Sequence, residues 1–289
     1  MRAALPLLLV ALACARETPV ELEAVPAVDL DTLDPRAAAL IRERRDAGDP
    51  GALGMAYHAY DQVPAALACY RNARRLAPED ARWPYYEGLL LLQAGDLPAA
   101  RETFAAAAGL QEAGGSDEQR VALACRRGDL ELTAGDHAAA REHFERAFAL
   151  RPESAAPRIG LGRAALESDD PAGALPHLRR AVELLPFASN AHYLLGTAYR
   201  RLGQAALAEK HLRLAEAPDH VPAAVADPLS EDVLVLADSA YRQRHLGARY
   251  FLAGRFDAAA RELRKALAAK PDDVVSRTNL AAALTRLGR

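Results

Sequence analysis

The sequence has few aromatic residues and no large excess of charge of either sign. Phenylalanine, tyrosine and tryptophan make up 6% of its 289 residues. A large core lined by aromatic rings is therefore not expected, and small side chains must supply much of the close packing. Its 36 basic and 39 acidic residues give a formal net charge of −3. Because no block of lysine and arginine creates a basic field, we expect no nucleic-acid binding.

Hydrophobic runs are short as well. The apolar run Leu5–Leu12 is far shorter than the ~20 residues that a bilayer-spanning helix needs. Arg2 precedes this run, and small residues and Cys14 follow it. Such an order is typical of a signal peptide, which we place at residues 1–14 and leave out of the fold.

Two processing sites fit this N-terminus. The stretch Ala11-Leu12-Ala13-Cys14 resembles a bacterial lipobox, in which the cysteine is lipidated, although Ala11 stands where leucine is usual. Alternatively, Ala13-Cys14-Ala15 fits the A-x-A site of ordinary signal peptidase. We favour lipidation of Cys14, which predicts a periplasm-facing lipoprotein of the bacterial cell envelope. The alternative predicts a soluble periplasmic or secreted protein.

Cysteine and catalytic motifs are scarce too. Besides Cys14 the chain has only Cys69 and Cys125, which form no disulfide framework and are expected to pack as small buried thiols. Phosphate-binding glycine loops and Gly-x-Ser-x-Gly elbows are missing. His137 and His143 are six residues apart, so they do not share a helix face as metal ligands would. We therefore expect no enzyme activity, metal or cofactor.

The sequence does contain an internal repeat, which is the main signal for its fold. Six copies share a glycine in their first half and an alanine 12 residues later, mostly at a spacing of 34 residues. The glycines are Gly54, Gly88, Gly128, Gly162, Gly196 and Gly247, and the alanines are Ala66, Ala100, Ala140, Ala174, Ala208 and Ala259. About six extra residues lie between the second and third copies, around a turn-rich stretch, and about 17 lie between the fifth and sixth.

The local chemistry of each copy fits two amphipathic helices. Apolar residues recur at helical spacing, as in Ala174, Leu178 and Val182. Glycines such as Gly95 and Gly135 can end the first helix in a left-handed conformation, and prolines such as Pro78 and Pro152 stop the second. We expect Gly162 and Ala174 to pack against each other where the two helices of the fourth copy cross.

This pattern resembles the tetratricopeptide-repeat family over residues 47–289, apart from the insertions. The chain departs from the family where an early tryptophan is usual, since Pro50, Pro84, Ala124, Arg158 and His192 stand there. The resemblance implies an all-α fold, a right-handed superhelical solenoid of helix-turn-helix repeats. It also implies binding of other proteins rather than catalysis.

Segments outside the pattern complete the predicted organisation. Residues 15–34 are expected to be a flexible tether. Residues 35–222 contain a capping helix followed by copies one to five. Residues 223–239 are an insertion or linker with a short helix starting near Ser230, and residues 240–289 hold copy six and a terminal half copy.

In this family the first helix of each copy faces a concave groove. Carried onto this chain, the groove positions mix tyrosine and arginine, both frequent in recognition surfaces. The resulting candidate partner-binding residues are Arg82, Tyr85, Leu89, Arg163, Tyr193, Arg200 and Arg244. The arginines favour an acidic or carboxylate-bearing protein or peptide partner.

The resemblance favours a non-catalytic protein–protein interaction scaffold in the cell envelope, held at the membrane by a lipid on Cys14. It would bind a partner peptide or domain in the groove and support assembly of an envelope complex. An accessory subunit that organises a cell-wall or polysaccharide enzyme is the alternative. The partner, the oligomeric state and the pairing of Cys69 and Cys125 stay open at this point.

Overall fold

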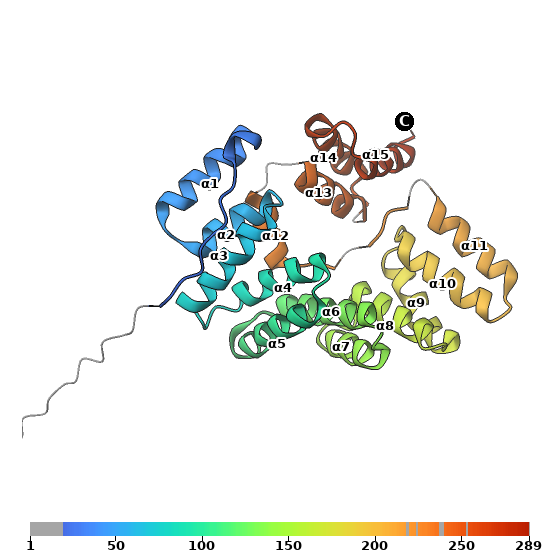
Figure 1. Cartoon of the computed structure of the whole chain (residues 1–289). Coiled ribbons are helices and arrows are strands. Elements are labelled where there is room, and N and C mark those ends of the chain that lie inside the picture. Colours follow the sequence, from blue (N-terminus) through green and yellow to red (C-terminus); the bar gives the residue numbers. More distant parts are fainter. Residues whose placement is uncertain (1–19, 218–219, 224, 237–239, 253, 289) are drawn as a thin grey trace, which may run out of the picture.

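A computed structural model describes residues 20–217, 220–223, 225–236, 240–252 and 254–288. These residues form fifteen α-helices and one short 3-10 helix, and no β-strand occurs among them. Consecutive helices stack side by side along a curved array (Figure 1), which confirms the predicted all-α, right-handed superhelical solenoid. The predicted signal peptide and Cys14 lie outside the described residues. Within the described ranges, no helix combines the length and apolar character needed to cross a bilayer.

Most helices come in antiparallel pairs that correspond to the six sequence copies. The pairs are α2 (Pro50–Ala59) with α3 (Val63–Leu76), α4 (Arg82–Ala94) with α5 (Leu97–Gly114), α6 (Asp117–Ala134) with α7 (His137–Leu150), α8 (Ala155–Glu167) with α9 (Pro171–Leu184), α10 (Ser189–Arg201) with α11 (Ala205–Glu216), and α13 (Ala240–Leu252) with α14 (Phe256–Ala269). Helix α1 (Pro35–Ala47) precedes the first pair, α15 (Val274–Arg286) follows the last, and α12 (Pro228–Leu236) lies in the insertion.

Within each pair, the shared glycine packs against the large side chain 16 positions later. A Cβ atom added to Gly128 would lie 2.6 Å from the Phe144 ring, and one added to Gly162 would lie 2.4 Å from Leu178. The other pairs of this kind are Gly54 with Tyr70, Gly88 with Phe104, Gly196 with Leu212, and Gly247 with Leu263. The expected contact of Gly162 with Ala174 is therefore corrected: the nearest neighbour of the glycine is Leu178, one helical turn further on.

Helix ends follow the local sequence signals. Gly95 and Gly135, at the ends of α4 and α6, have φ angles of 81° and 80°, the left-handed conformation that glycine adopts without strain. Asp96 and Asp136 then cap the following helices by accepting hydrogen bonds from backbone N–H groups. These tight turns confirm the predicted helix-turn-helix units.

The six extra residues between copies two and three do not form the expected loop. Instead they lengthen α5 and α6, which have 18 residues each. The Ser116 and Gln119 side chains form a capping box at the start of α6, so only a two-residue connection is needed. The turn-forming residues of this stretch thus start a helix rather than extend a loop.

The segment before α1 lies along α3, where the sequence predicted a flexible tether. The Asn72 side chain accepts a hydrogen bond from the Glu23 N–H at 2.7 Å and donates one to the Glu23 carbonyl at 2.8 Å. Val28, Leu30 and Leu33 pack against the first apolar cluster. The Asn72 amide thus binds both backbone polar groups of Glu23, and apolar side chains hold the residues after it. The prediction of a flexible tether is therefore corrected for residues 20–33.

The two cysteines in the described part of the chain are unpaired, as expected. Cys69 and Cys125 are both buried, and burial raises the pKa of each thiol to about 12. A thiol with so high a pKa is a poor nucleophile, so both act as small core side chains.

Candidate functional site

The inner side of the curved array carries a segment of the insertion between copies five and six. We call the described residues 220–223 and 225–236 the strap. From the end of α11 the chain turns back across the array, and α12 lies against α2, α4 and α6 and also contacts α13, the next helix in sequence (Figure 1). The strap therefore crosses the first helices of the repeats, which is the surface that the sequence analysis selected as the groove.

The extended part of the strap is held by its backbone. Val221 donates to the Phe187 carbonyl at 2.9 Å and accepts from the Ser189 N–H at 3.0 Å. Two residues later, the Asn190 amide donates to the Ala223 carbonyl at 3.2 Å and accepts from the Ala223 N–H at 3.0 Å. Because these bonds involve backbone groups, this end of the groove can hold a peptide with little regard to its side chains.

Asp227 gives the strap its one buried charge. Only 4% of this residue is exposed. Its carboxylate accepts hydrogen bonds from the Tyr85 hydroxyl at 2.5 Å and from Arg126 at 3.2 Å. It also accepts from the Ser230 hydroxyl at 2.6 Å and the Ser230 N–H at 3.1 Å. Burial, with the neighbouring Asp227 charge, raises the pKa of Tyr85 well above its ordinary value, so the phenol stays a hydrogen-bond donor.

The helical part of the strap inserts two apolar side chains. Leu229 and Val233, four residues apart on α12, are buried in the apolar cluster formed by the first two copies. Beyond them, the Tyr60 hydroxyl donates to the Leu236 carbonyl at 3.4 Å. Val235, in contrast, is 61% exposed, so α12 is amphipathic and uses one face to contact the groove. The helix begins at Pro228, two residues before the expected start near Ser230. The Asp227 side chain caps it by accepting a hydrogen bond from the Ser230 N–H.

The candidate residues from the sequence fall into three groups. Tyr85 is buried under the strap, and Leu89 is half-buried against the same apolar cluster. Three arginines are paired within the chain: Arg82 with Asp80, Arg163 with Asp129, and Arg244 with Asp273. Tyr193 and Arg200 are exposed on α10, and 55% of the tyrosine is accessible.

The groove therefore has less uncompensated positive charge than the sequence suggested. Arg82, Arg163 and Arg244 each have a carboxylate partner, and salt bridges of this kind reduce the field available to an acidic ligand. The structure brings Tyr85 together with Arg126, whereas Tyr193 and Arg200 lie at the other end of the strap, on the helix that also carries Asn190.

Three residues that hold the strap were not among the candidates. Asn190 and Arg126 lie on first helices. Asn190 stands at one of the groove positions that the family resemblance supplies but was not selected as a candidate, and a single guanidinium such as that of Arg126 has no local signature. Asp227 precedes a proline in a segment interpreted as a linker. Two signals for this contact were available in the sequence. Asp227 precedes Pro-Leu-Ser, and Asp is a good helix cap. Leu229 and Val233 then form an apolar pair four residues apart.

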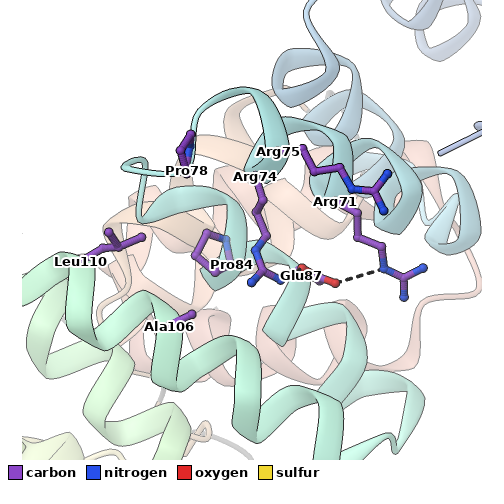
Figure 2. Close-up of a pocket in the computed structure, with 8 residues that line it drawn as sticks. All are labelled: Arg71, Arg74, Arg75, Pro78, Pro84, Glu87, Ala106 and Leu110. Carbon is purple, nitrogen blue, oxygen red and sulfur yellow. Dashed lines mark hydrogen bonds and ion pairs between the residues drawn. The ribbon is translucent and has the colours of Figure 1, made fainter. Parts of the chain in front are cut away.

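A second surface feature lies between α3 and α5. A pocket of about 450 Å³ is lined by three arginines, Arg71, Arg74 and Arg75, and by Glu87 of α4. Figure 2 shows Glu87 between Arg71 and Arg74, at 3.1 Å and 2.5 Å respectively. Arg75 donates to the Glu21 carbonyl. These partners bind the N-terminal segment and the first two copies together, so the pocket has a structural role.

We expect Glu87→Gln to lower the free energy of unfolding by about 2 kcal/mol, because the buried negative charge that pairs with Arg71 and Arg74 is removed and the new amide NH2 group faces an arginine donor. The matched control is Glu145→Gln, whose carboxylate pairs with Arg141 on an exposed helix face, where solvent screens the pair and its loss should change stability little. Urea unfolding of both variants gives the comparison. Equal losses would contradict the special role of Glu87.

Across the parts of the chain that the structure describes, no group of three or more His, Cys, Asp or Glu residues is placed to hold a metal ion. His192 and His211 do approach each other, with 2.9 Å between their Nδ1 atoms. Their rings stack as well, so this pair combines a hydrogen bond with a packing contact.

Together, the paired helices and the strap across their first helices define a helical-repeat architecture. Residues 52–117, 125–187 and 159–221 match the model of the Tetratricopeptide repeat family. These stretches cover more than half of the sequence, so the chain belongs to the tetratricopeptide-repeat family. Among curated proteins, no sequence matched this chain.

Solved structures show the same fold at low identity. A crystal structure of MamA is 18% identical, with a TM-score of 0.51, and the match covers 57% of this chain and 92% of that one. The 41-end form of MamA from Desulfovibrio magneticus RS-1 is 19% identical, with a TM-score of 0.52 and coverage of 64% and 96%. YrrB, a TPR protein with an unusual peptide-binding site, is 21% identical, with a TM-score of 0.44 and coverage of 72% and 95%. At these identities the MamA structures support the fold alone.

Proposed function

We propose that this protein is a non-catalytic interaction scaffold that binds a partner peptide or domain along its groove. The observation that carries the proposal is the strap itself. The first helices hold a polypeptide segment through hydrogen bonds from the Asn190 side chain to the strap backbone and an ion pair of Arg126 with Asp227. The apolar side chains of Leu229 and Val233 add contacts with the core. Those are the contacts that extended-peptide and helix-in-groove recognition use.

The exposed face of α10 is the part of the groove that we assign to first contact with the partner. Tyr193, Thr197 and Arg200 follow one another at helical spacing, so they share a face. Tyrosine offers a large rigid contact area, and arginine offers a planar charged group with several hydrogen-bond donors. Both are frequent among residues that dominate binding energy. Arg200 favours a partner with an acidic or carboxylate-bearing segment.

We further propose that the scaffold works in the bacterial cell envelope, anchored through a lipid on Cys14, where it supports assembly of a multiprotein complex. The N-terminal sequence pattern supports this location. If Cys14 is lipidated, the parent protein should partition into detergent, whereas Cys14→Ser should remain unprocessed or soluble. A fully soluble parent protein that begins at Arg16 would instead favour the ordinary signal-peptidase site.

The binding face is tested by capture of partners in living cells. A photo-crosslinking residue at position 197 should trap the partner, and mass spectrometry would identify it. Tyr193→Ala with Arg200→Ala should weaken capture by roughly 30-fold or more, the effect of losing one hot-spot residue or more. Circular dichroism should be unchanged, because both side chains are exposed.

The control for this experiment is Leu207→Ala. Leu207 is an exposed apolar residue on α11, the second helix of the same copy, so its loss should leave capture intact. Raised salt should weaken capture if Arg200 contributes charge. Undiminished capture by the double variant, together with loss in the Leu207 variant, would refute binding on the inner face.

A further inference from the structure

We propose that the strap is an internal ligand, and that a partner segment of the same chemistry displaces it from the groove. This inference rests on the proposed function and specifies both the ligand and its regulation. The predicted partner segment has small apolar residues in an extended stretch, then an acidic residue, then one short amphipathic helix. Its two apolar anchors lie two and six positions after the acidic residue, as Leu229 and Val233 do after Asp227.

The groove does not need the strap for its own construction. Each first helix packs on its own second helix through the glycine contacts, as Gly88 does on Phe104 and Gly128 on Phe144. The strap, in contrast, contributes a helix of nine residues. A helix this short is unstable alone in water, so α12 owes its conformation to the groove. Such a segment can leave while the repeats stay folded.

The strap also leaves polar groups of the groove unsatisfied. The Tyr86 hydroxyl and the Nε atom of Arg126 are buried, and neither has a hydrogen-bond partner among the residues that the structure describes. Tyr86 follows Tyr85, which bonds to Asp227, and Arg126 binds the same carboxylate. A buried donor without a partner is destabilising. A segment with an acceptor for either group would therefore bind more favourably than the strap does.

Covalent attachment explains why the strap nevertheless occupies the groove. Because it is part of the same chain, its binding is intramolecular and acts at a high effective concentration. A partner must overcome this competition, so weak or incomplete matches are excluded. The strap thereby sets a threshold for binding and protects the apolar groove until the partner is present.

A labelled peptide with the sequence of residues 220–236 tests the inference on the full chain. In one variant, Leu229→Ser with Val233→Ser weakens the strap and leaves the groove unchanged. This variant should bind the peptide about tenfold more tightly than the parent chain, because its groove is open for a larger fraction of the time. Adding Arg126→Ala to this variant should abolish binding. A peptide with Asp227→Asn and Leu229→Ser is the matched control and should not bind.

Hydrogen exchange gives a second measurement on the parent chain, which is needed if the weakened variant fails to fold. Excess peptide should accelerate exchange of the α12 amides and leave α4 and α6 protected. Absence of peptide binding to folded parent and variant chains, without change in exchange, would overturn the inference. If the variant forms dimers whose amount rises with concentration, a second copy of this chain occupies the groove. That result would overturn the assignment of the groove to a segment of a different protein. The proposed function fails separately, through the Tyr193 and Arg200 capture experiment.

Discussion

Replacing Phe144 with alanine should lower the free energy of unfolding by about 3–5 kcal/mol, the cost of a large cavity in a tight core. Phe144 is almost completely buried, and its ring lies against two glycines. A Cβ atom on Gly128 would approach the ring to 2.6 Å, and one on Gly160 would approach it to 2.3 Å. The ring therefore fills the crossing of α6, α7 and α8, and no neighbouring side chain at the glycines can move into the cavity.

The matched variant is Phe144→Leu, which should cost only about 1 kcal/mol. The three following copies have leucine at this position, namely Leu178, Leu212 and Leu263, so leucine is compatible with this helix crossing. Urea unfolding followed by circular dichroism would measure both changes. If the alanine variant unfolds at the same urea concentration as the parent, the ring does not join copies three and four.

Acidification from pH 7 to pH 4 should destabilise the protein, with His58 as a major cause. Burial lowers the pKa of His58 from 6.5 to about 4 in the folded chain. The His58 ring lies 3.1 Å from the Tyr70 hydroxyl and contacts the Tyr70 and Tyr86 rings. The neutral form is therefore the one that the fold accommodates.

The sign follows from proton linkage. Between pH 6.5 and pH 4 the unfolded chain binds a proton at His58 and the folded chain does not, so stability falls as pH falls through this window. The loss from this residue alone should reach about 2–3 kcal/mol. Burial also lowers the pKa values of His211 and His245 to about 4, so they act in the same direction.

Unfolding free energies measured at several pH values would test this expectation. His58→Gln should reduce the slope between pH 6.5 and pH 4 without removing it, because His211 and His245 remain. Identical slopes for the parent and the variant would show that His58 is not the group responsible.

The repeat architecture could be predicted because its contacts are local in sequence. The glycine of each first helix meets a side chain only 16 positions away, as Gly54 meets Tyr70, and the turns between helices carry their own signals at Gly95 and Gly135. Even there, a contact was assigned one helical turn too early, at Ala174 instead of Leu178. Spacing identifies the face of a helix more reliably than the residue at its crossing point.

The candidate site was only partly predictable. The first helices do share a surface, and Tyr193 and Arg200 are exposed on it, but their role in binding stays a prediction. Tyr85 was selected as a residue for a partner, yet in this structure its hydroxyl bonds to Asp227 of the same chain. Asn190 stands at a groove position carried over from the family, but neither it nor Arg126 was selected, because the partners of both lie in an insertion without a repeat pattern.

The sequence by itself determined the family, the paired helices and the surface formed by the first helices, because each depends on patterns within about one copy of the repeat. Only the tertiary structure decided what lies on that surface. Tyr85 and Asp227 are 142 residues apart, and their contact depends on the curvature that several stacked copies build up. The location of the strap is therefore a property of the whole array, since no local pattern encodes which helices the insertion will reach.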